Sequence, residues 1–320
     1  MLRHIVCCNF KNCRHFYLLF TYCHAHGVKT QADVRLELIE MEKAELASGK
    51  PPDNISATSL LTAALDIEDA QCAPLQASID NMHHTYSIRR CALQVKVAQL
   101  DNSPTATQRA HIEESRLVLH KRILNFRATQ ALLVPETVMP TDTEEDKPEC
   151  ATLRLPSELV GSCPFSPRVQ SLANMEASLR FAQATDAVSG LRQSLTIRAE
   201  LSRYKGMQVR GQHANTRMRA LLAGAEEKTM MFASRYRRAR LAYARLMGPG
   251  DWECILKPLN DADIRPVSSH QDDEGLTART GPREGHRRVS WIYMMPGGSE
   301  DSIQLSDGVL CAYRSTISTV

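Results

Sequence analysis

Apolar side chains that recur every seven residues constrain the fold of this 320-residue chain more than any other feature of its sequence. This spacing keeps the apolar side chains on one side of an α-helix, so each series predicts a long helix that packs against a second helix. Aromatic residues make up only 5% of the chain, and its other apolar residues are those that commonly fill helix interfaces. We therefore expect an all-α fold of long helices. The series are Ile112, Leu119, Phe126 and Leu133, joined by Ile123; Met218, Ala225, Phe232, Ala239 and Leu246; and Leu222, Thr229, Tyr236 and Tyr243.

Residues 31–134 are expected to form a first helical region. Its opening helix should stop near Ser48, because a glycine and two prolines follow. Ser56 or Thr58 is expected to cap the second helix. Two further stripes in 75–133, separated by a short break, predict a coiled-coil-like helical hairpin. Its facing side chains would be Ile79, Leu93 and Leu100 on one arm and Ile112, Leu119 and Phe126 on the other.

The remaining regions differ in composition. Residues 1–30 are expected to be irregular or to contain a misassigned start. Residues 135–167 carry six prolines and an acidic run, which predicts a linker whose second half, "ATLRLPSEL", lies extended against another part of the chain. Residues 168–247 predict long basic helices that end at the "GPGDW" motif. Residues 248–320 are expected to be an irregular, poorly ordered tail, with one short strand or apolar docking segment at 289–293.

The formal net charge of +3 conceals a strong asymmetry along the chain. Residues 31–69 contain nine Asp and Glu against three Lys and Arg, and we interpret these carboxylates as a solvated helix face. Residues 192–245 contain thirteen Lys and Arg against three Glu, a net charge of +10. A strongly basic helical region can bind a polyanion such as nucleic acid. The same pattern is also typical of a solvated face, and both interpretations stay open.

Motifs for catalysis or cofactor binding are missing from the sequence, which has no phosphate loop, dinucleotide-binding glycine motif, zinc-protease motif or nucleophile elbow. Zinc could bind Cys8, Cys13, Cys23 and His26, but their spacing includes no Cys-x-x-Cys pair, so we expect no metal. The apolar run at 16–22 is too short to cross a bilayer. We expect a nuclear or cytoplasmic protein with no cofactor, membrane contact or small-molecule substrate.

Three blocks of sequence carry a resemblance to a known family. They are "LRQSLTIRAELSRYKGMQVRGQHANTRMRALL", "ASRYRRARLAYARLMGPGDWECILKPLNDADIR" and "EGHRRVSWIY", and they follow "TSLLTAALDIEDAQ" in that order. Over residues 26–293 this order resembles the C-terminal helical region of the Kyakuja-Dileera-Zisupton (KDZ) transposases of fungi. In that family a Cys-rich module and an RNase H-like acidic catalytic core lie upstream. The resemblance therefore implies that this chain lacks the catalytic part and is not an enzyme, and it supplies no catalytic residue.

The segment "VRGQHANTRMR", residues 209–219, joins the two basic helices and has two interpretations. In the structural one, Gly206 and Gly211 permit a turn between antiparallel helices. Asn215 would then lie on the helix interface and fix its register, because it falls on the second seven-residue series. The arginines of the segment would be solvated.

In the functional interpretation the arginines of the segment bind DNA phosphates, while Gln212 or Asn215 reaches a base edge or a sugar. Arg210 and Arg217 are seven residues apart and would share a helix face. Arg238 and Arg245 form a second such pair, with Arg235 on the same stripe. The candidate DNA-binding residues are Arg210, Gln212, Asn215, Arg217, Arg219, Arg235, Arg238 and Arg245.

Two classes of function follow from the sequence. The first is a non-catalytic helical accessory region of a KDZ-like transposase, or a truncated remnant of one, that assists DNA binding or self-association through its helical interfaces. The second is a coiled-coil structural or interaction protein that binds no nucleic acid. The two classes differ in what they require of the basic region. In the first class the arginines must face the solvent, and in the second class they need not.

Overall fold

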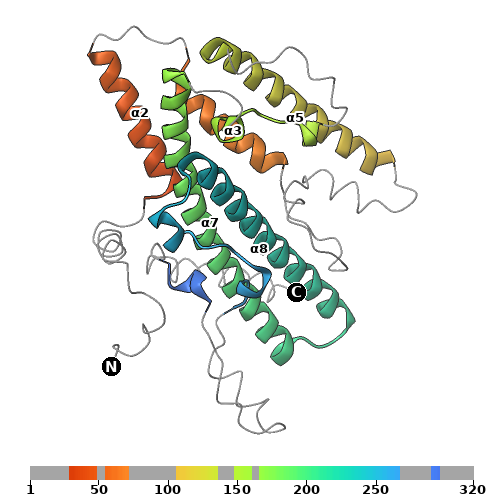
Figure 1. Ribbon diagram of the computed structural model, residues 1–320. Helices are drawn as coiled ribbons and strands as arrows, with labels where there is room; N and C mark the ends of the chain where they lie inside the picture. Colours follow the sequence, from red (N-terminus) through yellow and green to blue (C-terminus); the bar gives the residue numbers. More distant parts are fainter. Residues whose placement is uncertain are drawn as a thin grey trace, which may run out of the picture.

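The computed structural model describes residues 29–48, 55–71, 106–135, 148–160, 166–266 and 290–295 (Figure 1). Within these ranges every regular element is a helix and no strand occurs, which confirms the all-α prediction. The α-helices are α2 (Gln31–Ala47), α3 (Ala57–Gln71), α5 (Ala106–Leu133), α6 (Pro156–Leu159), α7 (Pro167–Gln208) and α8 (Gln212–Met247). Short 3-10 helices are η2 (Pro148–Cys150), η3 (Asp251–Cys254), η4 (Asp261–Asp263) and η5 (Trp291–Tyr293). None of the described helices is long and apolar enough to span a lipid bilayer.

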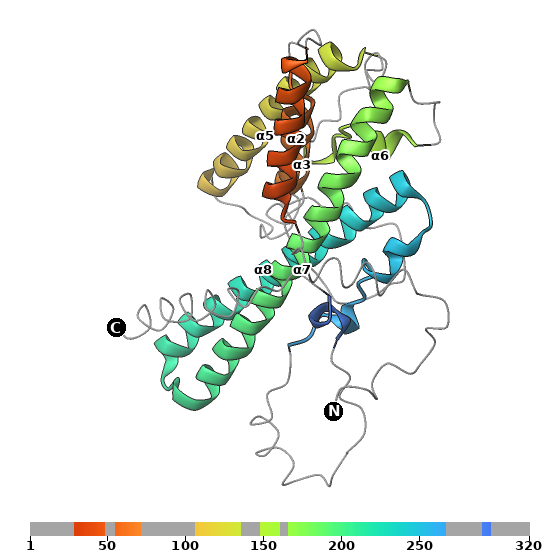
Figure 2. The same cartoon turned by 90° about the vertical axis from the view of Figure 1, so that its left-hand side faces the viewer.

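Helices α7 and α8 form a long antiparallel hairpin (Figures 1 and 2). Ser166 caps α7 by accepting a hydrogen bond from the amide of Val169, 3.3 Å away. Where the two helices meet midway, a Cβ at Gly190 would lie 2.4 Å from the ring of Phe232, so only glycine permits this close approach. Helix α8 ends at Gly248, which takes a positive φ of 67°, as the glycine in "GPGDW" predicts.

The interface between α7 and α8 follows the predicted seven-residue series. Met218, Ala225, Thr229, Tyr236 and Ala239 are all buried against α7 or the segments beside it. The other members of the two series, Leu222, Phe232, Tyr243 and Leu246, are half-buried. The hydrophobic stripe along α8 is therefore confirmed, and it is used inside the molecule.

One polar contact across the interface of α7 and α8 is a hydrogen bond between hydroxyls that the sequence did not indicate. The hydroxyl of Thr229 donates to the Ser194 hydroxyl 3.1 Å away, and both side chains are buried. Asn215, which we expected at the interface, is half-buried, and its Nδ2 donates instead to the carbonyl of Gly211 at the start of its own helix, 2.8 Å away. Two polar contacts thus join the two helices, a buried hydroxyl pair and an ion pair between Arg198 and Glu226 at 2.8 Å.

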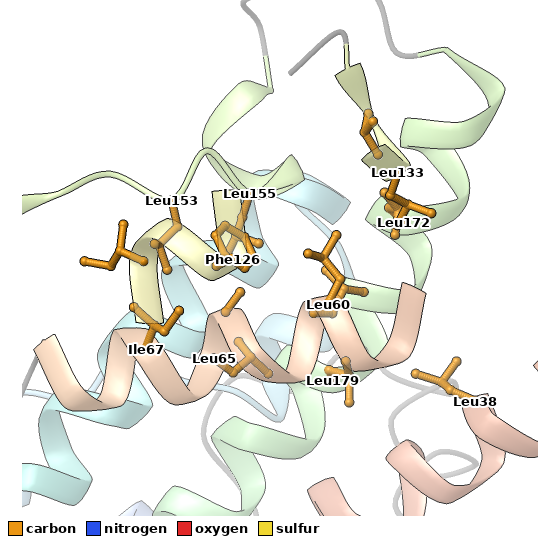
Figure 3. Close-up of a cluster of buried hydrophobic side chains, with 14 of the residues drawn as sticks. Leu38, Leu60, Leu65, Ile67, Phe126, Leu133, Leu153, Leu155, Leu172 and Leu179 are labelled. Atoms are coloured by element: carbon orange, nitrogen blue, oxygen red, sulfur yellow. The ribbon is translucent and has the colours of Figure 1, made fainter. Parts of the chain in front are cut away.

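Helices α2, α3 and α5 pack together beside the first half of α7 (Figures 2 and 3). Their shared core contains Leu38 of α2, Leu65 of α3 and Leu179 of α7. Every residue of the predicted α5 stripe is buried in it: Ile112, Leu119, Ile123, Phe126 and Leu133. In the described residues this stripe packs on α3 and on the chain around η2, which the sequence did not identify as its neighbours.

The end of α2 near Ser48 and the cap of α3 agree with the predictions, and the capping box at the start of α2 is an addition from the structure. Helix α2 begins with a capping box between Thr30 and Asp33 and ends at Ala47, with Ser48 as its C-cap. The Ser56 hydroxyl accepts a hydrogen bond from the amide of Ser59, 3.1 Å away, at the start of α3. A carboxylate then joins the two helices, because Glu42 accepts hydrogen bonds from the amide and hydroxyl of Thr58 at 2.8 and 2.7 Å.

The predicted linker contributes to the core in its second half. Leu153 and Leu155 are 3% and 2% exposed and lie among the side chains of α3 and α5 (Figure 3). The prediction that "ATLRLPSEL" packs against another part of the chain is therefore confirmed, but it is extended only over 151–155, because Pro156–Leu159 form helix α6. Several other predictions, including the first hairpin arm at 75–100 and the Cys and His cluster at 8–26, lie outside the described residues.

The strand predicted at 289–293 is wrong. Residues 290–295 instead contain the short helix η5, and this segment docks on the hairpin with Ile292 fully buried. The side chain of Arg192 explains how this segment is held, since it donates hydrogen bonds to the carbonyls of Ile292 and Met295. The guanidinium of Arg192 supplies the hydrogen bonds that these carbonyls would receive from a partner strand in a sheet. The alternative prediction, an apolar docking segment, is therefore the correct one.

Burial of the α5 stripe predicts the effect of a charge placed there. Leu119→Asp should lower the free energy of unfolding by several kcal/mol, because it leaves an unpaired carboxylate in the core. The matched control is Leu36→Asp on α2, where the parent side chain is 55% exposed. Urea denaturation followed by circular dichroism measures both, and equal midpoints for the two variants would contradict the packing of α5.

Candidate nucleic-acid interface

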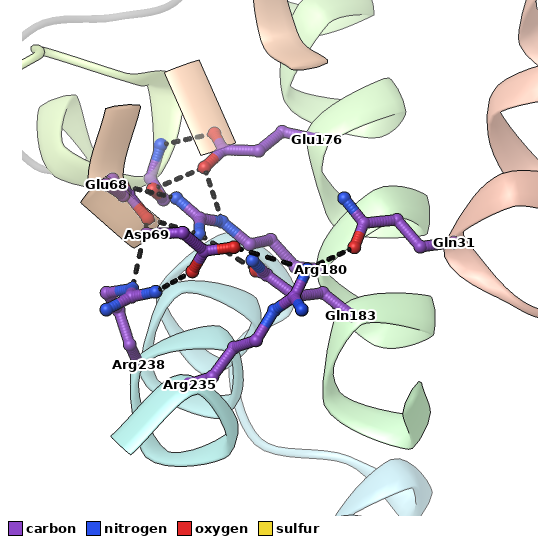
Figure 4. A network of polar contacts seen from close by, with 9 residues as sticks. Gln31, Glu68, Asp69, Glu176, Arg180, Gln183, Arg235 and Arg238 are labelled. Atoms are coloured by element: carbon purple, nitrogen blue, oxygen red, sulfur yellow. Dashed lines mark hydrogen bonds and ion pairs between the residues drawn. The ribbon is translucent and has the colours of Figure 1, made fainter. Parts of the chain in front are cut away.

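A buried guanidinium lies where α3, α6 and α7 meet. Arg180 of α7 is 1% exposed, and its two terminal nitrogens donate to the Glu68 carboxylate at 2.6 and 2.7 Å (Figure 4). Its Nε donates to Glu176 at 3.1 Å, and Nη1 also donates to the side-chain oxygen of Gln183. Glu176 accepts two further hydrogen bonds, from the amide and hydroxyl of Ser157 at 2.9 and 2.7 Å. The guanidinium therefore joins three segments that are distant in the sequence.

The network continues from α3 into α8 through Asp69 (Figure 4). Its carboxylate pairs with Arg235 at 3.2 Å and with Arg238, while Arg238 Nε lies 3.3 Å from Glu68. Arg235 also donates to the side-chain oxygen of Gln31 at the start of α2, 2.8 Å away. We call this set of contacts the root network, because it fixes the hairpin to α2 and α3.

Burial and charge act in opposite directions within the root network. Burial raises the pKa of Glu176, even though Arg180 and Ser157 both favour its ionised form. Burial likewise raises the pKa of Asp69, against the attraction of Arg238 and Arg235. Burial lowers the pKa of Arg180, but the carboxylates of Glu68 and Glu176 outweigh it, and the net shift of that pKa is upward. The central guanidinium is therefore a permanent positive charge that its neighbours must balance.

Two of the candidate DNA-binding residues belong to this network. Arg235 and Arg238 point into the fold, with side chains 27% and 15% exposed, and both bind carboxylates of α3. The interpretation of the 31–69 carboxylates as a solvated face is wrong for Glu68 and Asp69, which are the partners of these arginines. A single sequence does not show which opposite charges meet, so Arg235 and Arg238 could not be distinguished from solvent-exposed arginines.

Other arginines near the root of the hairpin also bind groups of the protein itself. Arg237 pairs with Asp261 at 2.5 Å and donates to the carbonyl of Leu259 at 3.0 Å. Arg240 donates to the carbonyl of Leu256, 2.8 Å away. These hydrogen bonds hold the chain that follows α8 against the helix.

Arg245, in the last turn of α8, is exposed and far along the helix from the 209–219 joint.

The opposite end of the hairpin has a different charge distribution. Residues 201–225, which we call the hairpin tip, contain five Arg and Lys and no Asp or Glu. The tip projects away from α2, α3 and α5 (Figure 2). Arg203, Arg210, Arg217 and Arg219 are exposed there, as are Gln212 and His213, and Lys205 is half-buried. A small core of Leu201, Val209, Met218 and Ala225 holds the two helices together beneath them.

The joint itself is a tight turn, which confirms that α7 and α8 are antiparallel. Val209 ends α7, and Gly211, with a positive φ of 87°, precedes α8. Glycine suits this conformation because a side chain there would be strained. Gly206 lies inside α7 and takes no part in the turn. Arg210 precedes α8, so it does not share a helical face with Arg217 through the seven-residue spacing.

Sequence reasoning missed the residues at the centre of the root network. Glu176, Arg180 and Gln183 lie on α7 at spacings of four and three residues, which places them on one face of the helix. That grouping is a signal for a polar cluster, but it does not show that the cluster is buried.

Within the described residues, no group of His, Cys, Asp or Glu is arranged to hold a metal ion.

Comparisons with known proteins found no matching family model, no matching curated protein and no matching solved structure.

The root network predicts a large and specific decrease in stability. Arg180→Met should lower the free energy of unfolding by about 3–5 kcal/mol, because it leaves buried carboxylates without their cation. Arg203→Met, which breaks the 2.8 Å surface pair with Glu200, should cost at most about 1 kcal/mol. Thermal and urea denaturation would measure the difference. Adding Glu68→Gln and Glu176→Gln to Arg180→Met should recover part of the stability, and the same stability for Arg180→Met and the parent would contradict the network.

Proposed function

We propose that this chain is a non-catalytic helical accessory region of a KDZ-like transposase, and that it binds nucleic acid through the hairpin tip. The observation that carries the proposal is the division of the basic residues along one hairpin. Arginines at the root bind carboxylates and carbonyls of the protein, whereas residues 201–225 have five basic residues and no acidic one, and of these five Arg203 pairs with Glu200 just before the tip. A surface with a net positive charge attracts phosphate groups.

The shape of the tip supports contact with a nucleic-acid backbone. It is the end of a two-helix projection, so a long polymer can approach it from more than one side (Figures 1 and 2). Arg210 lies in the turn, and Arg217 and Arg219 follow within the first turns of α8. Phosphate contacts of this kind position a protein without reading sequence. Gln212 is exposed beside them and is the side chain we propose to reach a sugar or base edge.

Asn215 has a smaller part in this proposal than in the sequence-based interpretation. Its Nδ2 already donates to the Gly211 carbonyl, which leaves its side-chain oxygen as the group that can face a ligand. Arg235 and Arg238 are omitted because their guanidinium groups bind Asp69 and Glu68. The proposed phosphate-binding residues are therefore those of the tip.

Replacing Arg210, Arg217 and Arg219 together with Gln tests the tip directly. The variant should bind duplex DNA more weakly than the parent at low salt. Its plot of log affinity against log salt should be shallower by roughly 0.9 for each phosphate that the variant no longer neutralises. Gln is an acceptable helix former, so the helical content should not change. A salt titration of fluorescently labelled duplex, with circular dichroism of both proteins, measures these outcomes.

A matched control separates local phosphate binding from total charge. Arg35, Lys43 and Arg122 are exposed on α2 and α5, and their replacement by Gln removes the same three charges away from the tip. This control should retain the parent's salt dependence. If the parent binds no DNA at low salt, or if both triple variants weaken binding equally, the tip is not the interface. In the first case a structural or interaction protein without nucleic-acid binding becomes the better description.

The proposal also makes a prediction about catalysis. Purified chain supplied with Mg²⁺ or Mn²⁺ should neither cleave nor join DNA, because the resembled region lies downstream of the acidic catalytic core in KDZ transposases. Gel assays on labelled supercoiled and linear DNA test this. Metal-dependent cleavage that co-purifies with the chain and disappears in a variant of its own carboxylates would refute the accessory role.

A further inference from the structure

We infer that the hairpin tip binds B-form DNA by entering its major groove, with the two broad faces of the hairpin toward the phosphates of the two strands. This rests on the proposed function, because it takes the tip as a nucleic-acid surface and adds the form of the duplex and the groove. The observation that carries it is the position of Arg217 and Arg219 on either side of Met218. Both arginines are exposed, whereas Met218 is buried between the helices.

The two arginines leave α8 on opposite broad faces of the hairpin. Successive residues of an α-helix are about 100° apart around its axis. Met218 faces α7, since it belongs to the small core beneath the tip. Arg217 and Arg219 therefore lie on the two sides of the plane that contains both helices. By the same count, exposed Gln212 shares the side of Arg219, and exposed His213 shares the side of Arg217.

The thickness of the hairpin fits the major groove of DNA. An α-helix with its side chains is about 10–12 Å across, so the hairpin is one helix thick between its broad faces and two helices wide. The major groove of B-form DNA is about 12 Å wide, and the minor groove is about 6 Å wide. The tip can therefore enter the major groove with its wider dimension along the groove, whereas the minor groove is too narrow for it.

The positions of the charges along the hairpin fit the depth of the same groove. Arg217 and Arg219 lie about 9 and 12 Å along α8 from Gly211, at roughly 1.5 Å per residue. The major groove is about 8.5 Å deep. When the turn reaches the base edges, these two arginines are therefore near the level of the phosphates on either side. Arg210 and Gln212 are then beside the base edges, with which both side-chain types can form hydrogen bonds.

The fold does not have to change for the tip to enter the groove. The tip projects away from α2, α3 and α5 (Figure 2). Arg192, which holds η5, lies about 24 Å along α7 from Gln208. This length is greater than the depth of the groove, so the root network and η5 can keep their contacts while the tip is bound.

Other nucleic acids offer the tip fewer contacts. A single strand that lies along one broad face reaches only one of the two arginines. The major groove of A-form RNA is deep and narrow, so it does not admit the tip. B-form DNA is therefore the ligand that uses both faces of the hairpin.

Single substitutions test contact with both strands. Arg217→Gln and Arg219→Gln should each flatten the plot of log affinity against log salt by about 0.9 on duplex DNA, and the double variant by about 1.8. Arg122→Gln on α5 also removes one exposed arginine, and it should leave the slope unchanged. If only one of the two tip arginines affects the slope, the tip does not lie between the strands. That result overturns the inference but leaves phosphate binding by the tip in place.

Chemical protection tests the groove itself. Dimethyl sulfate methylates guanine N7, which lies in the major groove, and adenine N3, which lies in the minor groove. A short duplex saturated with the chain should be protected at guanine N7 and should react as before at adenine N3. Unprotected guanine N7 overturns the inference, as does equal or tighter binding to single-stranded DNA or duplex RNA of the same sequence. A parent that binds no nucleic acid overturns the proposed function as well.

Discussion

The charge on Arg180 is the constraint on which the rest of the structure depends. A guanidinium removed from water is stable only if carboxylates and carbonyls surround it, so its burial requires Glu68 of α3 and Glu176 of α7 to stand at fixed positions. Those positions in turn bring Asp69 within reach of Arg235 and Arg238 on α8. Apolar packing supplies most of the stabilisation of a helical protein, but it tolerates sliding of one helix past another. The root network joins α3, α7 and α8 through contacts that depend on their alignment.

The same network determines which basic residues face solvent. The sequence gives no way to distinguish the thirteen Lys and Arg between residues 192 and 245. In the structure, arginines at the root of the hairpin donate hydrogen bonds to acceptor groups of the protein itself. The acidic segment at 31–69 is thereby partly neutralised within the fold, whereas the hairpin tip keeps five basic residues and contains no carboxylate of its own. This division gives the arginines at the root of the hairpin a structural role.

The hairpin tip is separate from the root network along α7 and α8. It is basic, polar and narrow, which suits contact with phosphates.

The sequence by itself determined the helices, because the seven-residue apolar spacing and the caps at Thr30, Ser56 and Gly248 are local properties of the chain. It also indicated the buried stripes of α5 and α8, since periodicity specifies which side of a helix is apolar, whereas the structure decided that Gly206 lies within α7 and that the turn is at Gly211. Only the tertiary structure decided that Arg235 and Arg238 are bound, which helices Leu153 and Leu155 pack against, and that the segment at 290–295 docks as η5 and does not form the alternative strand. The physical reason is distance along the chain: Arg180 and Glu68, or Arg192 and the η5 carbonyls, are separated by about a hundred residues, and no local pattern encodes which opposite charges will meet.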